Sequence, residues 1–118
     1  MAENEPSLPP HGGYCGLKAY QNAEIIHDAT IVFCRRFLKP NDRTTDQMVQ
    51  ASRSGKQNIA EGSSVSGTSR STELKLIGVA RGSLEELKID YEDYLRQHDL
   101  ALWPKEHKRA IFIRNLAY

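Results

Sequence analysis

Six apolar residues recur at alternating spacings of three and four: Ile77, Ala80, Leu84, Leu87, Tyr91 and Tyr94. An α-helix turns once every 3.6 residues, so this spacing puts all six on one side of a helix. No alternation with a period of two, which would indicate a strand, competes with it. The pattern predicts a long helix from about residue 71 to 98, with Glu73 in its first turn, where an acidic side chain is favourable.

Two earlier segments show the same periodicity. In residues 14–38 the stripe consists of Ala19, Ala23, Ile26, Thr30, Phe33 and Phe37. Pro40 follows this segment, as expected after a helix end. Residues 45–61 form the second segment, and its stripe continues one residue beyond it. The stripe consists of Met48, Ser52, Gly55, Ile59 and Gly62.

The second stripe is made mainly of small residues, which let a neighbouring helix backbone come close. Gly55 within a helix costs about 1 kcal/mol relative to alanine, and tight packing would offset that cost. Gly62 is expected to be the left-handed residue just past the helix end.

The last periodic segment, residues 104–118, is shorter and has Pro104 in its first turn. Residues 1–13 contain three prolines and are expected to form a flexible N-terminal lead, followed by one helical-bundle domain at 14–118. The predicted fold is all-α: an antiparallel up-and-down four-helix bundle of three long helices and a short C-terminal helix. A short fourth helix would leave apolar stripes partly uncovered, which oligomerisation or a longer native chain would correct.

Length and composition bear on the number of domains and on the cellular compartment of the protein. The 118 residues fit one domain, and no apolar run approaches the ~20 residues that cross a bilayer. The N-terminus has neither a basic start nor an apolar core, so we expect no secretory signal and no membrane partner. Cys15 and Cys34 are expected to be free thiols in a reducing compartment, which predicts a cytoplasmic protein.

The patterns of known catalytic sites are missing from the sequence. A phosphate-binding loop needs Gly-x-x-x-x-Gly-Lys-Ser/Thr, but Gln57 follows Gly55-Lys56 and position 50 is glutamine. The four histidines are scattered and form no metal-binding pair. The sequence therefore predicts no enzymatic activity, no catalytic residue, no metal and no cofactor.

Glu86, Asp90 and Asp93 share one helix face. This acidic face is either a solvated surface or a docking surface for a basic partner.

Basic side chains gather around the first helix end, the second helix and the start of the third, and some of them should converge in a bundle. The candidate nucleic-acid-binding residues are Arg35, Arg36, Arg53, Lys56, Arg70 and Lys75. The alternative is an ordinary solvated surface, and the net charge of +1 argues neither for nor against nucleic acid. Few aromatic residues lie among them, so binding to RNA or DNA would depend on shape and charge rather than on base stacking.

Two motifs, NIAEG at 58–62 and ARGSLEEL at 80–87, carry a family resemblance. The chain resembles, over about residues 14–98, the bacterial four-helix bundle proteins first found encoded in intervening sequences of 23S ribosomal RNA genes. It is also similar to the accessory variability determinant proteins of diversity-generating retroelements. The family's last helix is usually long, so it stays open whether residues 104–118 are that helix or precede it.

The resemblance implies a homopentameric ring without enzymatic activity. It further implies RNA or DNA as a partner, or, as for the retroelement members, a scaffold or adaptor that docks a reverse transcriptase or another basic protein. It assigns interhelical or intersubunit hydrogen bonding around tight packing to the motif residues Asn58, Glu61, Gly62, Arg81, Gly82, Ser83 and Glu86.

Overall fold

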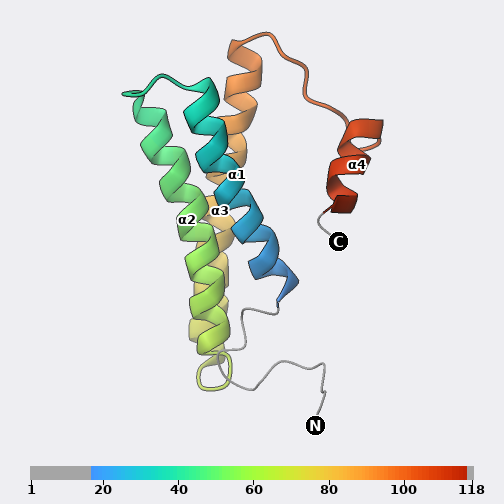
Figure 1. Cartoon of the computed structure of the whole chain (residues 1–118). Coiled ribbons are helices and arrows are strands. Elements are labelled where there is room, and N and C mark those ends of the chain that lie inside the picture. Colours follow the sequence, from blue (N-terminus) through green and yellow to red (C-terminus); the bar gives the residue numbers. More distant parts are fainter. Residues whose placement is uncertain (1–16, 117–118) are drawn as a thin grey trace. The chain divides into compact units, whose positions relative to one another are not determined.

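The computed structural model describes residues 17–116, and this part of the chain contains helices and no strand (Figure 1). The all-α prediction is therefore confirmed for these residues. The helices are α1 Lys18–Phe37, α2 Arg43–Ser64, α3 Arg70–Gln97 and α4 Lys108–Leu116. The flexible lead predicted at 1–13 and Cys15 lie outside the described residues.

Local capping explains where α2 and α3 begin. The Asp42 side chain accepts a hydrogen bond of 2.9 Å from the Thr44 backbone N–H and so satisfies one of the unpaired donors at the start of α2. At the start of α3, the Ser69 hydroxyl accepts a hydrogen bond of 3.2 Å from the Thr72 N–H. Serine and aspartate at these positions therefore set two of the helix boundaries.

The prediction for Gly62 was wrong. α2 continues to Ser64, and Val65 is its C-terminal cap, so Gly62 lies inside the helix. The reason is packing: a Cβ on Gly62 would lie 3.1 Å from the Ile77 Cδ1 atom and 3.6 Å from the Glu73 carbonyl oxygen of α3. This glycine provides room for α3 and does not turn the chain.

The start of the last helix also differs from the prediction. α4 begins at Lys108 and not at Pro104. The His107 ring provides the physical reason, because its Nδ1 atom accepts a hydrogen bond of 3.0 Å from the Arg109 backbone N–H and caps the helix there. Pro104 instead belongs to a turn, in which its carbonyl oxygen accepts a hydrogen bond of 2.9 Å from the His107 N–H.

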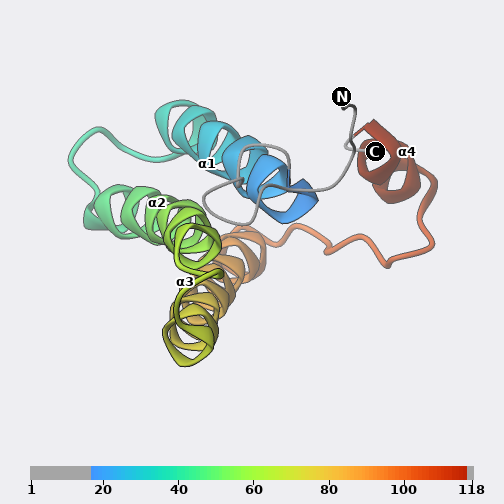
Figure 2. The ribbon, with the colours of Figure 1, turned by 90° about the horizontal axis from the view of Figure 1, so that it is seen from below.

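The chain divides into two compact units, residues 1–87 and 88–118. In the first unit, α2 lies beside both α1 and the first part of α3 (Figures 1 and 2). Contacts between α2 and α3 join Gly55 to Leu84 and Gly62 to Ile77, so residue numbers rise along one helix as they fall along the other. His27 of α1 likewise contacts Ser52 of α2. The complete four-helix arrangement stays a prediction.

The core of the first unit is built from small side chains. Ala23, Ile59 and Ala80, one from each helix, are buried together, and Tyr20 packs against them. Two polar residues, Thr30 and Ser52, have no exposed surface at all. Small residues at these positions allow the helices to approach closely.

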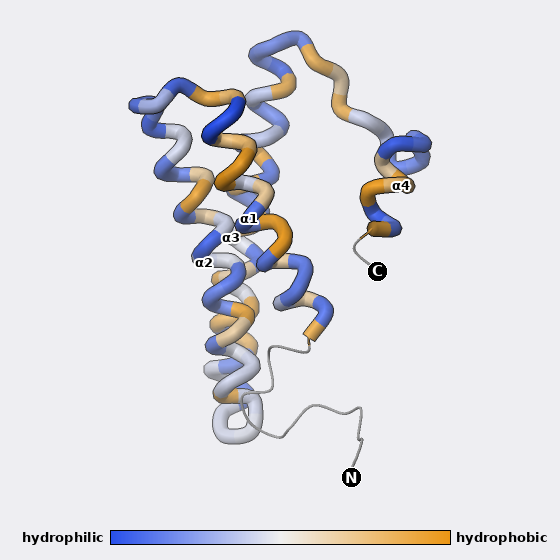
Figure 3. Tube along the Cα trace, viewed as in Figure 1, coloured by the Kyte–Doolittle hydropathy of each residue, from blue (hydrophilic) through white to orange (hydrophobic). Residues whose placement is uncertain are grey.

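The stripe predicted on α1 coincides only partly with its buried side. Ala23 and Thr30 are buried, whereas Ile26 and Phe37 are exposed. The side that faces α2 is rotated toward His27, which hydrogen-bonds Ser52, and toward the buried Cys34. Apolar bands therefore remain at the surface of α1 (Figure 3).

Candidate functional site

A buried serine and a histidine form the contact between α1 and α2. The Ser52 hydroxyl donates its only proton to the Val49 carbonyl oxygen at 2.9 Å. The His27 Nδ1 atom, 2.8 Å from the Ser52 oxygen, must therefore be the donor in that second bond. A serine nucleophile needs the opposite direction, with its hydroxyl donating to the imidazole. The pair is thus arranged to hold two helices together.

Positive charge gathers around this histidine. The pKa of His27 is lowered from its ordinary value of 6.5, first by burial and then by the charge of Lys56, with a smaller contribution from Arg53. Asp28 opposes these effects. We call His27, Arg53 and Lys56 the α1–α2 basic patch. Neither Arg53 nor Lys56 forms an ion pair within residues 17–116.

The other candidate basic residues lie elsewhere. Arg35 and Arg36 are exposed in the last turn of α1, and the Arg36 guanidinium lies 5.9 Å from the centre of the Phe37 ring. Arg70 opens α3 and lies 3.9 Å from the Glu73 carboxylate.

Lys75 lies on the side of α3 away from α2. It is two residues from Ile77, which contacts Gly62 of α2, and two helical residues differ by about 200° in direction. Arg53 stands in the same relation to Gly55, so it faces away from α3. Of the six candidates, Arg53 and Lys56 are the two whose charges lower the pKa of His27.

The first motif region forms a polar contact between α2 and α3. The Asn58 side-chain amide donates to the Ser54 carbonyl oxygen at 2.8 Å and to the Ser54 hydroxyl at 3.1 Å. The Ser54 hydroxyl in turn lies 3.0 Å from the Ser83 hydroxyl of α3. Asn58 therefore orients Ser54, and Ser83 makes the interhelical bond.

Apart from Gly62, which is buried against α3, the remaining motif residues lie at the surface. Glu61 is exposed on α2, and Arg81, Gly82 and Glu86 are exposed on α3. Within the first unit they do not contribute to the buried core. Their surface positions leave them available for contact with a second molecule.

The described residues contain neither a metal-binding cluster nor a reactive thiol. No group of three or more His, Cys, Asp or Glu side chains within residues 17–116 is placed to hold a metal ion. Cys34 is a buried, unpaired cysteine, and burial raises the pKa of its thiol, which keeps it protonated and unreactive. None of the helices in this part of the chain is long and apolar enough to cross a membrane.

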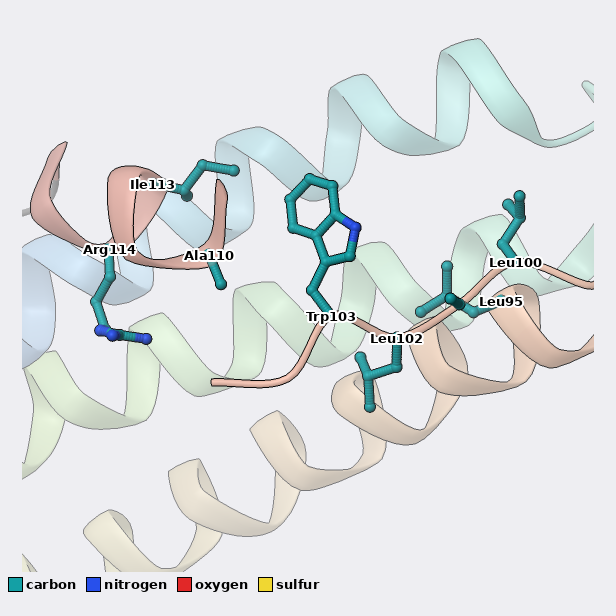
Figure 4. Close-up of a pocket in the computed structure, with 8 residues that line it drawn as sticks. Leu95, Leu100, Leu102, Trp103, Ala110, Ile113 and Arg114 are labelled. Carbon is teal, nitrogen blue, oxygen red and sulfur yellow. The ribbon is translucent and has the colours of Figure 1, made fainter. Parts of the chain in front are cut away.

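The second unit contains an apolar pocket that the sequence reasoning missed (Figure 4). Its volume is about 700 Å³, and apolar side chains line it, including Leu95, Leu102, Trp103 and Ile113. Arg114 is its one charged lining residue. The run LALW at 100–103, apolar but too short for a helix, was the available signal.

Comparison with known proteins found no matching family model, no matching curated protein and no matching solved structure.

Proposed function

We propose that this protein is a non-catalytic homo-oligomer that binds RNA or DNA through basic surface residues in the cytoplasm. The α1–α2 basic patch is the observation that carries the proposal. Two long cationic side chains lie beside one histidine, and neither side chain is neutralised by a carboxylate in the described part of the chain. Such groups bind phosphate oxygens, and the release of counterions from the nucleic acid supplies the free energy.

Exposed apolar surface supports the self-association. The buried hydrophobic core contains three alanines, whereas Ile25, Val32, Phe37 and Leu74 are each at least 49% exposed. Ile25 and Val32 lie two turns apart on one line of α1, and exposed apolar residues that are grouped in this way are typical of an interaction surface. The proposed assembly is a pentamer, as the family resemblance implies, with each copy an antiparallel up-and-down bundle of three long helices and a short C-terminal helix.

Binding to a fluorescently labelled RNA hairpin at about 50 and 200 mM salt tests the nucleic-acid proposal. The double variant Arg53→Ala/Lys56→Ala should bind more weakly at low salt. Its slope of log affinity against log salt should fall by about one for each lost phosphate contact.

The variant Lys105→Ala/Lys108→Ala is the matched control, since it removes two exposed charges outside the α1–α2 basic patch. Equal losses in both variants would mean that only overall charge matters. No binding by the wild-type protein at low salt would overturn the proposal.

A second candidate function is a scaffold that docks a basic protein, such as a reverse transcriptase. Glu86 favours it, because this residue is exposed on α3 and is in no ion pair within residues 17–116. The test is binding to a retroelement reverse transcriptase. Glu86→Gln should weaken that complex, while Arg53→Ala/Lys56→Ala should not.

A further inference from the structure

Two glycines on α3 have no explanation within the described part of their own chain. A Cβ on Gly55 or Gly62 of α2 would lie against Leu84 or Ile77, so both glycines make room for α3. A Cβ on Gly78 or Gly82 would have no described atom within 4 Å. Glycine weakens the interior of a helix, so its presence here indicates close approach by another molecule.

The surface around these glycines is apolar at its centre and charged at its two ends. Gly78 and Gly82 are one helical turn apart, and Leu74, one turn earlier, is 58% exposed. Lys75 lies seven residues before Gly82, and Glu85 lies seven residues after Gly78, so both exposed charges are on the same side of the helix as the glycines. We call these five residues the α3 outer face.

α1 carries a second surface with exposed apolar residues between two charges. Ile25 and Val32 are 52% and 49% exposed and lie two turns apart on one line of the helix. Asp28 and Arg36 are exposed on opposite edges of that line. These four residues form the α1 outer face, which is acidic before its middle and basic after it.

The charges on the two faces are complementary when the helices run parallel. The α3 outer face is basic at Lys75 and acidic at Glu85. A parallel alignment about 50 residues out of register therefore puts Asp28 beside Lys75 and Arg36 beside Glu85. The same alignment places Val32 over the gap left by Gly78 and Gly82.

We propose that the α1 outer face of one copy packs in parallel against the α3 outer face of a second copy. The inference rests on the self-association proposed above and identifies its surfaces. Within one copy, α1 and α3 each run opposite to α2 and hence parallel to each other. Rotation about an axis along the helices preserves these directions. The contact is heterologous, because two different faces meet in it. Each copy carries both faces, so a closed ring of copies leaves neither face uncovered.

Cysteine cross-linking in a Cys15→Ser background, in which Cys34 is buried, tests the contact. Val32→Cys and Gly82→Cys are made in separate chains, mixed and treated with an oxidant. The mixture should give a covalent two-chain product, and each variant alone should not. A chain carrying both substitutions should give a ladder of linked copies. Gly82→Cys has open space around its side chain, and circular dichroism checks that both variants fold.

Gln57→Cys mixed with Val32→Cys is the matched control, since Gln57 is exposed on α2 outside both faces. It should give no product. A single-copy mass for the wild-type protein would overturn the proposed self-association and this contact with it. An oligomeric mass without the mixed product would overturn this contact alone. Cross-linking of Gly82→Cys by itself would replace it with a symmetric α3–α3 contact.

Discussion

Gly55 of α2 packs directly against Leu84 of α3: a Cβ on Gly55 would lie 2.6 Å from the Leu84 Cδ2 atom. Real carbon atoms do not approach this closely, so any side chain at position 55 must push Leu84 aside. Gly55 also belongs to the buried surface of α2, where little relaxation is possible. This contact, together with that of Gly62 and Ile77, therefore limits how closely the two helices approach.

Gly55→Ala should destabilise the protein. Overpacking costs about 1–3 kcal/mol, and the better helix propensity of alanine returns about 1 kcal/mol. We expect a lower midpoint of urea unfolding. Leu84→Ala should be destabilising by itself but should lose less stability when Gly55→Ala is present, because the methyl group then occupies vacated space. Additive effects of the two substitutions would contradict the contact.

The Asn58 and Ser83 side chains should affect folding rather than assembly. The bonds of Asn58 are to Ser54 in its own helix, and Ser83 completes the link to α3 of the same copy. Asn58→Ala and Ser83→Ala should each cost about 0.5–1.5 kcal/mol of unfolding free energy. Light scattering at concentrations where both variants are folded should give the wild-type mass. Loss of the oligomer with helicity retained would instead put these residues at a subunit interface.

Glu61→Ala is the matched control for those two variants. The Glu61 side chain is exposed and is in no ion pair within the described residues. Its removal should change the unfolding free energy by less than about 0.5 kcal/mol. A larger loss of stability would mean that this carboxylate has a partner in the folded protein.

Stability should fall at mildly acidic pH because of His27. Its folded-state pKa is lower than the ordinary value of 6.5 expected in the unfolded chain, so the unfolded chain takes up a proton first as the pH falls. The stability is complete well above 6.5 and decreases as the pH drops through 6.5 toward the folded pKa. Urea midpoints measured between about pH 8 and 5 should show this decrease. His27→Gln, which can still donate a hydrogen bond to Ser52, should show a smaller one.

Local periodicity allowed the helices to be predicted, and their contacts were harder to predict. The small stripe of α2 correctly located close packing at Gly55, because glycine has few other uses inside a helix. The buried side of α1 was misplaced, because Ile26 is apolar but exposed, while His27 is the residue that contacts α2. The basic patch depends on the pairing of α1 with α2, which no local pattern in the sequence encodes.

The start of α4 could not be predicted from the sequence either. Histidine is not among the residues usually expected at a helix N-terminus, so His107 gave no signal in the sequence. His107→Ala should remove the bond to Arg109 and the stacking with Trp103, whose ring centre lies 4.9 Å away. We expect fraying of the first turn of α4 and a changed fluorescence spectrum of Trp103, the only tryptophan. His107→Asn, with a good capping side chain, should retain the helix.

Reversing one charge at the proposed contact between copies should weaken assembly. Reversing the facing charge as well should restore it. Arg36→Glu would place two negative charges together at the position facing Glu85. We expect the concentration at which the oligomer forms to rise by roughly fivefold, equivalent to about 1 kcal/mol per contact. Arg36→Glu combined with Glu85→Arg should return it toward the wild-type value, and high salt should reduce both effects.

Sedimentation velocity over a range of protein concentrations measures the concentration at which the oligomer forms. Glu61→Arg combined with Arg36→Glu is the matched control, because Glu61 is exposed on α2 outside both outer faces and the change adds the same positive charge. Restoration by Glu85→Arg but not by Glu61→Arg would identify the pair, since general charge balance would make the two rescues equal. Failure of both would mean that Arg36 and Glu85 do not meet in the assembled protein.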